Sequence, residues 1–342
     1  MNDKKIFPAL IANEAIKNLC GKDILRSHIS HAYIIDGPDG SGKHTAAKQI
    51  AMAILCENKG KSSAPCPCGV CPSCKKAAAG FSTCIEYVNR GSAATLQVET
   101  IRKMLSAVSY LPEDGDHKIY IIEDAHKMTT AAQNALLLTL EEPPSHAVFI
   151  LLTSDSGALL ETVRSRALVL KTELLSVHSI LSALTSMVDM GKIPDVGTEK
   201  MKTAASASSG CLGRAVEFCT ASEDSGSMKL RSIGEKLTDT LLFASAAEAI
   251  MYCRSVDLKR PEYETVFYYA MAFLRDYIAV KSGADETIVS IDTDKCKQTA
   301  ERLALPRLYR TYELLRAAEE DITKRNASPL VVLCTLAANA TK

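Results

Sequence analysis

The stretch that decides the fold is Gly37-Pro-Asp-Gly-Ser-Gly-Lys-His-Thr45, which follows an apolar run at His31–Asp36 and leads into a helical pattern. It matches the phosphate-loop template G-x-x-x-x-G-K-[ST] at every position except the last. Glycines at 37, 40 and 42 let backbone N–H groups turn inward around phosphate oxygens, and the N-terminus of the following helix adds positive potential. The stretch therefore predicts a phosphate-binding loop in which Lys43 reaches the β- and γ-phosphates of a nucleotide.

The last position of the template differs. His44 stands where a hydroxyl should bind Mg²⁺, and Thr45 comes one residue late. Imidazole is a poor ligand for Mg²⁺, which prefers oxygen. The sequence thus predicts an intact phosphate-binding loop beside a damaged metal position, so nucleotide binding stays open; the alternative is a glycine-rich turn without a ligand.

Short apolar runs and helical patterns alternate over residues 1–171. The runs predict buried strands at His31–Asp36, Ile85–Asn89, Lys118–Ile122, Val148–Thr153 and Ala167–Lys171. Helical patterns lie between them at Thr45–Leu55, Val98–Ser109 and Thr130–Leu140. This alternation predicts an α/β domain with a parallel sheet.

The remainder of the chain is helical by pattern. The pattern predicts a small helical domain at residues 172–222 and an all-helical domain at residues 228–342. The polar segment at 222–227 is predicted to be the linker between them. Pro261, Pro306 and Pro329 mark helix starts in the last of these.

Composition limits the functions that are open to the chain. Its 342 residues include 40 Lys and Arg and 40 Asp and Glu, so the chain has no strong positive electrostatic potential that would attract nucleic acid. If it acts on DNA, it should do so as part of an assembly. No signal peptide and no membrane-spanning run are visible, which predicts a cytoplasmic protein without a membrane contact. In a reducing compartment, 12 cysteines argue against a disulfide framework.

The strand at 118–122 ends in two carboxylates, Glu123 and Asp124. Such a strand end places an Asp near Mg²⁺ and a Glu near the attacking water in P-loop enzymes. Here the order is reversed, which changes the reach of each carboxylate by one methylene and predicts weak catalysis or none. The alternative is that both acids cap the next helix.

A cysteine cluster follows the phosphate-loop helix. Cys68, Cys71 and Cys74 are spaced so that their thiolates converge on a tetrahedral metal. Cys56 would supply the fourth ligand, and Cys66 is a possible substitute for it. The sequence predicts a structural zinc module at about residues 56–74; an iron–sulfur cluster and a metal-free loop are the alternatives.

Several segments between residues 10 and 220 resemble the AAA+ clamp-loader subunits of bacterial DNA polymerase III, of both the delta-prime and the gamma/tau type. Asn134-Ala-Leu-Leu-Leu-Thr-Leu-Glu-Glu-Pro-Pro144 is similar to that family's N-A-L-L-K-T-L-E-E-P-P, with Leu138 in place of Lys. Ser30-His-Ala-Tyr33, Leu96–Arg102 and the cysteine module are also similar. The resemblance implies an AAA+-type domain, a small helical lid and a helical collar.

The resemblance also implies roles for three further residues. Ser154 matches the sensor 1 position, and Arg214, in Gly210-Cys-Leu-Gly-Arg-Ala215, matches the sensor 2 region near a nucleotide. Ser165-Arg166-Ala167 resembles the family's S-R-C motif, with Ala in place of Cys. In this family the Arg is an arginine finger that acts on ATP held by a neighbouring subunit.

Within the family, the departures favour the delta-prime type. His44, the reversed acidic pair and Ser82-Thr83-Cys84 in place of H-P-D all differ from the ATP-hydrolysing gamma/tau type. The resemblance then implies a stationary scaffold with weak or absent ATPase activity, part of the DNA polymerase III holoenzyme. Its partners would be gamma/tau and delta subunits and, through the complex, the sliding clamp and primed DNA. An active gamma/tau-type ATPase is the alternative, and an unrelated P-loop ATPase a more remote one.

Overall fold

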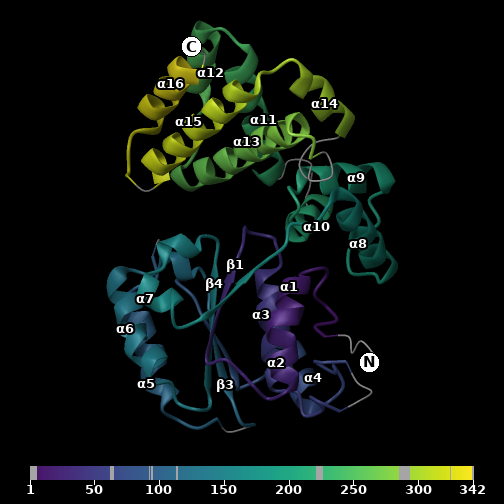
Figure 1. Ribbon diagram of the computed structural model, residues 1–342, viewed down its shortest axis with the longest axis vertical. Coiled ribbons are helices and arrows are strands. Elements are labelled where there is room, and N and C mark those ends of the chain that lie inside the picture. The colour runs from purple at the N-terminus through teal and green to yellow at the C-terminus, as the bar shows by residue number, and fades with distance from the viewer. Residues whose placement is uncertain are drawn as a thin grey trace. The chain divides into compact units, whose positions relative to one another are not determined.

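The computed structural model describes residues 6–61, 65–91, 93, 95–112, 115–220, 226–284, 293–323 and 325–340 (Figure 1). The chain divides into two compact units, Met1–Glu173 and Leu174–Lys342. The first unit is an α/β domain and the second is helical. Among the described residues, no helix is both long enough and apolar enough to cross a membrane.

The first unit is built on a five-stranded parallel sheet with the strand order β2-β3-β4-β1-β5. Its strands are β1 (Ala32–Asp36), β2 (Ile85–Val88), β3 (Lys118–Ile122), β4 (Ala147–Thr153) and β5 (Leu168–Lys171). All five predicted strands are confirmed, with bounds that differ by at most one residue. The central strand β4 is buried along its whole length, as expected of a parallel strand covered on both faces.

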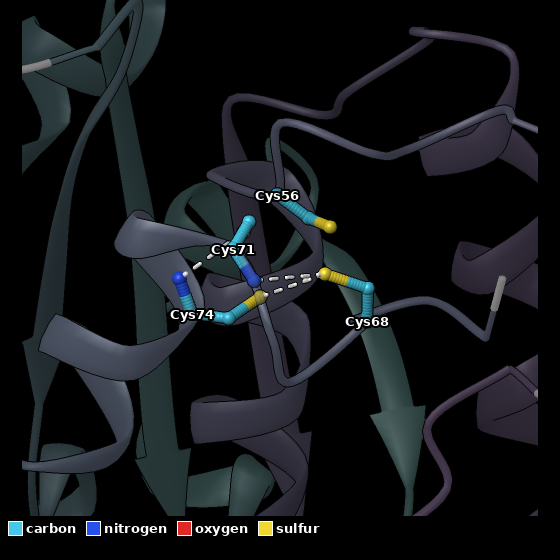
Figure 2. A group of neighbouring side chains, drawn as sticks. All are labelled: Cys56, Cys68, Cys71 and Cys74. Atoms are coloured by element: carbon cyan, nitrogen blue, oxygen red, sulfur yellow. Dashed lines mark hydrogen bonds between the residues drawn. The ribbon is translucent and has the colours of Figure 1, made fainter.

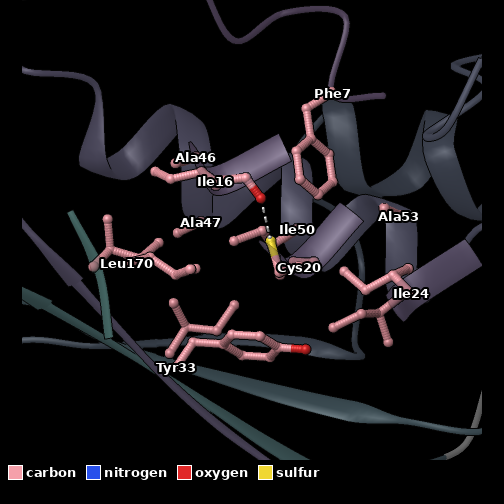
Figure 3. Close-up of a cluster of buried hydrophobic side chains, with 14 of the residues drawn as sticks. Phe7, Ile16, Cys20, Ile24, Tyr33, Ala46, Ala47, Ile50, Ala53 and Leu170 are labelled. Carbon is pink, nitrogen blue, oxygen red and sulfur yellow. Dashed lines mark hydrogen bonds between the residues drawn. The ribbon is translucent and has the colours of Figure 1, made fainter. Parts of the chain in front are cut away.

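One face of the sheet packs against the N-terminal helices and the helix after the phosphate loop (Figure 3). These are α1 (Glu14–Ile16), the short π-helix η1 (Lys17–Gly21), α2 (Lys22–Leu25) and α3 (Lys43–Ile54). Tyr33 from β1 lies under Cys20 and Ile50, and the Cys20 thiol donates to the carbonyl of Ile16 at 3.1 Å. Alternate strand residues supply this face because side chains along a strand point to opposite sides.

The opposite face carries a second core. Its sheet residues include Ile34, Tyr120 and Phe149. The rings of Tyr120 and Phe149 stack, with their centroids 5.5 Å apart. The covering helices are α5 (Val98–Val108), α6 (Thr130–Glu141) and the short α7 (Glu161–Arg164), with the 3-10 turns η2 (Ala125–Lys127) and η3 (Ser156–Ala158) between them. Thr129 is the N-cap residue of α6, and its side chain accepts a hydrogen bond from the N–H of Ala132.

The second unit is helical in its described residues. Its helices are α8 (Val177–Asp189), α9 (Thr198–Ala207), α10 (Leu212–Thr220), α11 (Gly226–Phe243), α12 (Ala246–Ser255), α13 (Arg260–Lys281), α14 (Thr293–Glu301), α15 (Leu305–Thr323) and α16 (Pro329–Ala340). Pro261, Pro306 and Pro329 lie in the first turns of α13, α15 and α16, as predicted. The predicted linker at 222–227 lies mostly outside the described residues, and α11 begins at Gly226. The predicted division of this half into a lid and a collar stays a prediction.

Helices α11 and α13 approach each other closely at Gly234. A Cβ atom at this position would lie 2.9 Å from the Cβ of Tyr269 and 2.9 Å from the carbonyl oxygen of Val266. Both distances are shorter than a van der Waals contact. The two helices can therefore come this close only because residue 234 has no side chain.

Candidate functional site

The phosphate loop and both acidic residues lie at one edge of the sheet. Because all strands are parallel, their carboxyl ends meet at the same edge. Asp36, the last residue of β1, pairs with Thr153 of β4, and Glu123 directly follows β3. The structure therefore brings the loop at 37–43, the acidic pair and Ser154 to a common edge.

The loop is folded around the side chain of Lys43. Gly40 and Gly42 have φ angles of 79° and 94°, a region that glycine enters without steric cost. Lys43 is 7% exposed, and its Nζ donates to the carbonyl of Gly37 at 2.6 Å and to Oδ1 of Asp39 at 2.9 Å. An entering phosphate would compete with Asp39 for this ammonium group.

The start of the loop is held by the end of β5. A Cβ atom on Gly37 would lie 1.8 Å from Oγ1 of Thr172, so only glycine fits there. Thr172 Oγ1 also donates to Oγ of Ser41 at 2.9 Å, and the N–H of Gly37 donates to the carbonyl of Thr153 at 3.1 Å. The loop is thus fixed to two neighbouring strands.

His44 contacts the first residue of the acidic pair. Its Nε2 lies 3.1 Å from Oε1 of Glu123, although the two residues are 79 positions apart. The side chain of His44 is 65% exposed and that of Glu123 25% exposed. The structure thus pairs the group that replaces the metal-binding hydroxyl with a carboxylate that the sequence analysis places at the nucleotide site. Thr45 is exposed on the next position of α3.

The other predicted residues of this edge are also paired. Asp124, with a φ angle of 49°, accepts from Nε of Arg90 at 3.0 Å. The Ser154 hydroxyl lies 3.2 Å from Nε2 of His126, in the turn after the acidic pair. Asp124 is the N-cap residue of η2, but its side chain makes no cap hydrogen bond there.

Arg166 lies away from the phosphate loop. Leu168 pairs with Tyr33, at the beginning of β1, and Arg166 comes two residues earlier, so it lies beyond the opposite edge of the sheet. The three steps from Tyr33 to Asp36 span roughly 10 Å along the strand. Nη2 of Arg166 lies 2.7 Å from Oε1 of Glu141, at the end of α6.

Arg214 belongs to the second unit. Its guanidinium carbon lies 3.9 Å from the ring centroid of Tyr268 in α13, and 5.5 Å from that of Tyr269. These distances are typical of cation–π contacts. A place for Arg214 near a nucleotide stays a prediction.

The four cysteines Cys56, Cys68, Cys71 and Cys74 converge in a buried group (Figure 2). All four Sγ atoms lie within 4.8 Å of one another, and those of Cys68 and Cys74 are 4.0 Å apart. In a tetrahedral zinc site with Zn–S bonds of 2.3 Å, sulfur atoms lie about 3.8 Å apart. The group therefore fits zinc, with four ligands and no open position for a substrate.

The local backbone favours thiolates at this group. Cys71 caps α4 (Pro72–Ala78), and its Sγ accepts from the N–H of Cys74 at 3.4 Å. The Sγ of Cys68 accepts from the N–H of Cys71 and from the Asn58 amide, both at 3.4 Å. Burial alone would raise the pKa of the Cys68 thiol, but these hydrogen bonds outweigh it and lower that pKa to about 6. Burial raises the pKa of Cys56 and of Cys74, and a bound metal would reverse this by ligating the deprotonated sulfur.

Cys66 is not part of the group. It lies in the core between the sheet and the N-terminal helices, and its carbonyl accepts from the N–H of Phe7 at 2.8 Å. The structure thus selects Cys56 over Cys66 as the fourth candidate ligand. Glu57 next to Cys56 accepts two hydrogen bonds from Ser73, which fastens the loop to α4.

Sequence reasoning missed four partners of the predicted residues, namely Asp39, Arg90, His126 and Glu141. The spacing of Asp39 and Lys43, four residues apart across the start of a helix, could have indicated their ion pair. Nothing local in the sequence indicates the pairs of Arg90 or Glu141, because their partners are 34 and 25 positions away.

Comparison with known proteins identifies relatives of this fold and site. Residues 12–175 match the family described as DNA polymerase III, delta subunit. The gamma subunit of DNA polymerase III from Buchnera aphidicola (subspecies Schizaphis graminum) is 34% identical over 186 residues, covering 54% of this chain and 50% of that protein.

Two further relatives align along most of the chain. The gamma subunit from Buchnera aphidicola (subspecies Acyrthosiphon pisum) is 25% identical, over 87% of this chain and 84% of that protein. The tau subunit from Bacillus subtilis is 26% identical, over 94% of this chain and 59% of that protein. The chain thus spans half the length of the first relative and 59% of the tau subunit. Along most of its length the chain is therefore similar to gamma and tau subunits of DNA polymerase III, and residues 12–175 are similar to the family described as DNA polymerase III, delta subunit.

Proposed function

We propose that this chain is the delta-prime-type subunit of a DNA polymerase III clamp loader. In this role it is a largely stationary scaffold that lends Arg166 to the ATP site of a neighbouring gamma/tau subunit. Together with gamma/tau and delta subunits, it would take part in loading the sliding clamp onto primed DNA. Its own ATPase activity would be weak or absent.

The contact between His44 and Glu123 is the observation that carries this proposal. In P-loop enzymes a hydroxyl at the position of His44 and the first carboxylate at the end of a neighbouring strand, the position of Glu123, hold Mg²⁺. Here these two positions are occupied by an imidazole and a carboxylate that are 3.1 Å apart. A site arranged in this way lacks the hydroxyl ligand for magnesium and engages the carboxylate at the other ligand position, which favours a scaffold over an ATPase.

The place of Arg166 supports a role on another subunit. It lies beyond the edge of the sheet opposite to the phosphate loop, so it is far from the nucleotide position of its own chain. Its side chain is 34% exposed, which leaves it accessible to a neighbour. Arginine fingers supplied by a second protein accelerate phosphoryl transfer by roughly 10³–10⁵-fold.

The cysteine group would hold a structural zinc ion through Cys56, Cys68, Cys71 and Cys74. Zinc bound there would fold a loop that has few apolar residues of its own. The small core around it contains Met52, Ala77 and the half-buried Ile85. We therefore assign the metal a role in stability and none in a reaction.

The test is the ATPase rate of the whole loader, reconstituted with gamma/tau and delta subunits and stimulated by clamp and primed DNA. Replacing the finger (Arg166→Ala) should lower the rate by at least tenfold, whereas replacing the loop lysine (Lys43→Ala) should lower it less than twofold. Equal losses from the two variants would contradict the scaffold role.

An active gamma/tau-type ATPase is the second candidate. It is favoured by the relatives, which are named gamma and tau, and by Lys43, which points into an intact loop. Turnover of ATP by the chain that is lost in Lys43→Ala would establish this alternative.

A further inference from the structure

The guanidinium of Arg166 is held on two sides by its own domain. Nη2 lies 2.7 Å from Oε1 of Glu141. Nη1 donates to the carbonyl of Thr162 at 3.0 Å and to the hydroxyl of Ser165 at 3.3 Å. Both terminal nitrogens, which a phosphate would need as donors, are therefore engaged within the chain.

The position of Glu141 does not stabilise its own helix. It is the last residue of α6, where the partial negative charge of the helix end disfavours a carboxylate. The ion pair with Arg166 compensates for this position. The next residue, Glu142, is also exposed at the end of the helix, and the described contacts of Arg166 do not include it.

We propose that Glu141 is a positioning residue for Arg166, which holds the guanidinium against its own domain and competes for it with the neighbour's γ-phosphate. The inference rests on the proposed function, in which Arg166 acts on another subunit. It goes beyond that function because it assigns a residue that sets how readily the finger is delivered.

The strength of the pair suits such a competition. Glu141 is 45% exposed and Arg166 34% exposed, and ion pairs in contact with water are weak. A γ-phosphate carries more charge than a carboxylate and accepts bidentate hydrogen bonds from arginine. The phosphate can therefore displace Glu141, but each delivery of the finger must first break the pair.

The experiment compares four variants in the reconstituted loader: Glu141→Gln, Glu142→Gln, Arg166→Ala and the double variant Glu141→Gln/Arg166→Ala. Glu141→Gln should raise kcat for ATP by about two- to fivefold, the effect expected from losing one exposed ion pair. The KM for ATP should stay unchanged, because the finger acts on the transition state. Glu142→Gln removes the same charge from the adjacent position and should leave kcat unchanged.

The double variant separates positioning from a structural effect. If Glu141 acts through Arg166, its substitution should change nothing once Arg166 is alanine. An effect of Glu141→Gln that persists in the double variant, or a kcat that is unchanged or lowered by Glu141→Gln alone, would overturn the inference while leaving the proposed function intact. A normal rate in Arg166→Ala would instead overturn the proposed function, and the inference with it.

Discussion

Nε2 of His44 and Oε1 of Glu123 lie 3.1 Å apart, at the point where a P-loop enzyme holds its magnesium ion. The pair joins the helix after the phosphate loop to the end of β3, through two residues that are 79 positions apart. It leaves the backbone of the loop and Lys43 in place. The residues predicted to bind phosphate and those at the metal position are thus different, and the two functions can be tested separately.

Restoring the hydroxyl should restore a role for magnesium. We expect the affinity of wild-type protein for a fluorescent ATP analogue to be the same with Mg²⁺ and with EDTA. In His44→Ser, Mg²⁺ should strengthen binding by about tenfold, equivalent to about 1.4 kcal/mol. Thr45→Ser, which alters the exposed hydroxyl one position further along, is the matched control. A tenfold effect of Mg²⁺ on the wild-type protein would contradict this prediction.

Zinc content should distinguish the two candidate fourth ligands. Purified wild-type protein should carry about one zinc per chain, and Cys56→Ser and Cys71→Ser should each lose it, as measured by atomic absorption. Cys66→Ser should keep its zinc, because Cys66 lies in the core near Phe7 and outside the thiol group. Loss of zinc in Cys66→Ser and its retention in Cys56→Ser would show that the ligands are assigned wrongly. Removing the zinc by chelation should lower the Tm of the wild-type protein.

Stability should fall at alkaline pH. Burial raises the pKa of Cys20 and of Cys253 from 9.0 to about 12, and that of Tyr120 from 10.0 to about 12. Between pH 9 and 12 for the two thiols, and between pH 10 and 12 for the phenol, the unfolded chain releases these protons while the folded chain keeps them, so the free energy of unfolding decreases as pH rises. Each fully shifted group contributes about 1.4 kcal/mol per pH unit.

Urea denaturation at pH 7.5, 9 and 10.5 would measure this decrease. In Cys20→Ala the slope above pH 9 should be shallower, because one of the buried thiols is gone. Equal free energies of unfolding at pH 7.5 and 10.5 would contradict the prediction.

The contact of α11 with α13 should not tolerate a side chain at position 234. Gly234→Ala places a Cβ atom 2.9 Å from Tyr269 and from the Val266 carbonyl, and should destabilise the protein by about 1–3 kcal/mol. Gly226→Ala, at the beginning of the same helix, has open space and should change stability little. Thermal unfolding of both variants tests the difference; an unchanged Tm in Gly234→Ala would mean that the helices separate at little cost.

The parts of the fold that depend on local patterns could be predicted from the sequence. The strands were found because buried parallel strands are short, apolar and bounded by polar residues, and the phosphate loop because its glycines have fixed spacing. The cysteine group can be predicted for the same reason, with Cys56 as the fourth ligand and Cys66 as its possible substitute. The fold decides between these two ligands, because Cys66 lies in the core, where its carbonyl accepts a hydrogen bond from Phe7.

The parts that depend on long-range pairing could not be predicted. Three contacts depend on how elements far apart in the sequence are arranged in the domain. They are His44–Glu123, Arg90–Asp124 and Arg166–Glu141. Charged side chains at a surface choose among several partners that differ by less than about 1 kcal/mol, so no sequence pattern marks the choice. The roles of Arg166, Ser154 and Arg214 toward a nucleotide remain predictions.

The parallel register of β1 and β5 gives the chain a direction. The predicted nucleotide site lies at one edge of the sheet. The guanidinium of Arg166, which would act on a neighbour, lies beyond the other edge. Copies of such a domain can follow one another in a row, each serving the next. A member that supplies the guanidinium but binds no nucleotide can stand only at the end of that row, and its presence there would close the row on that side.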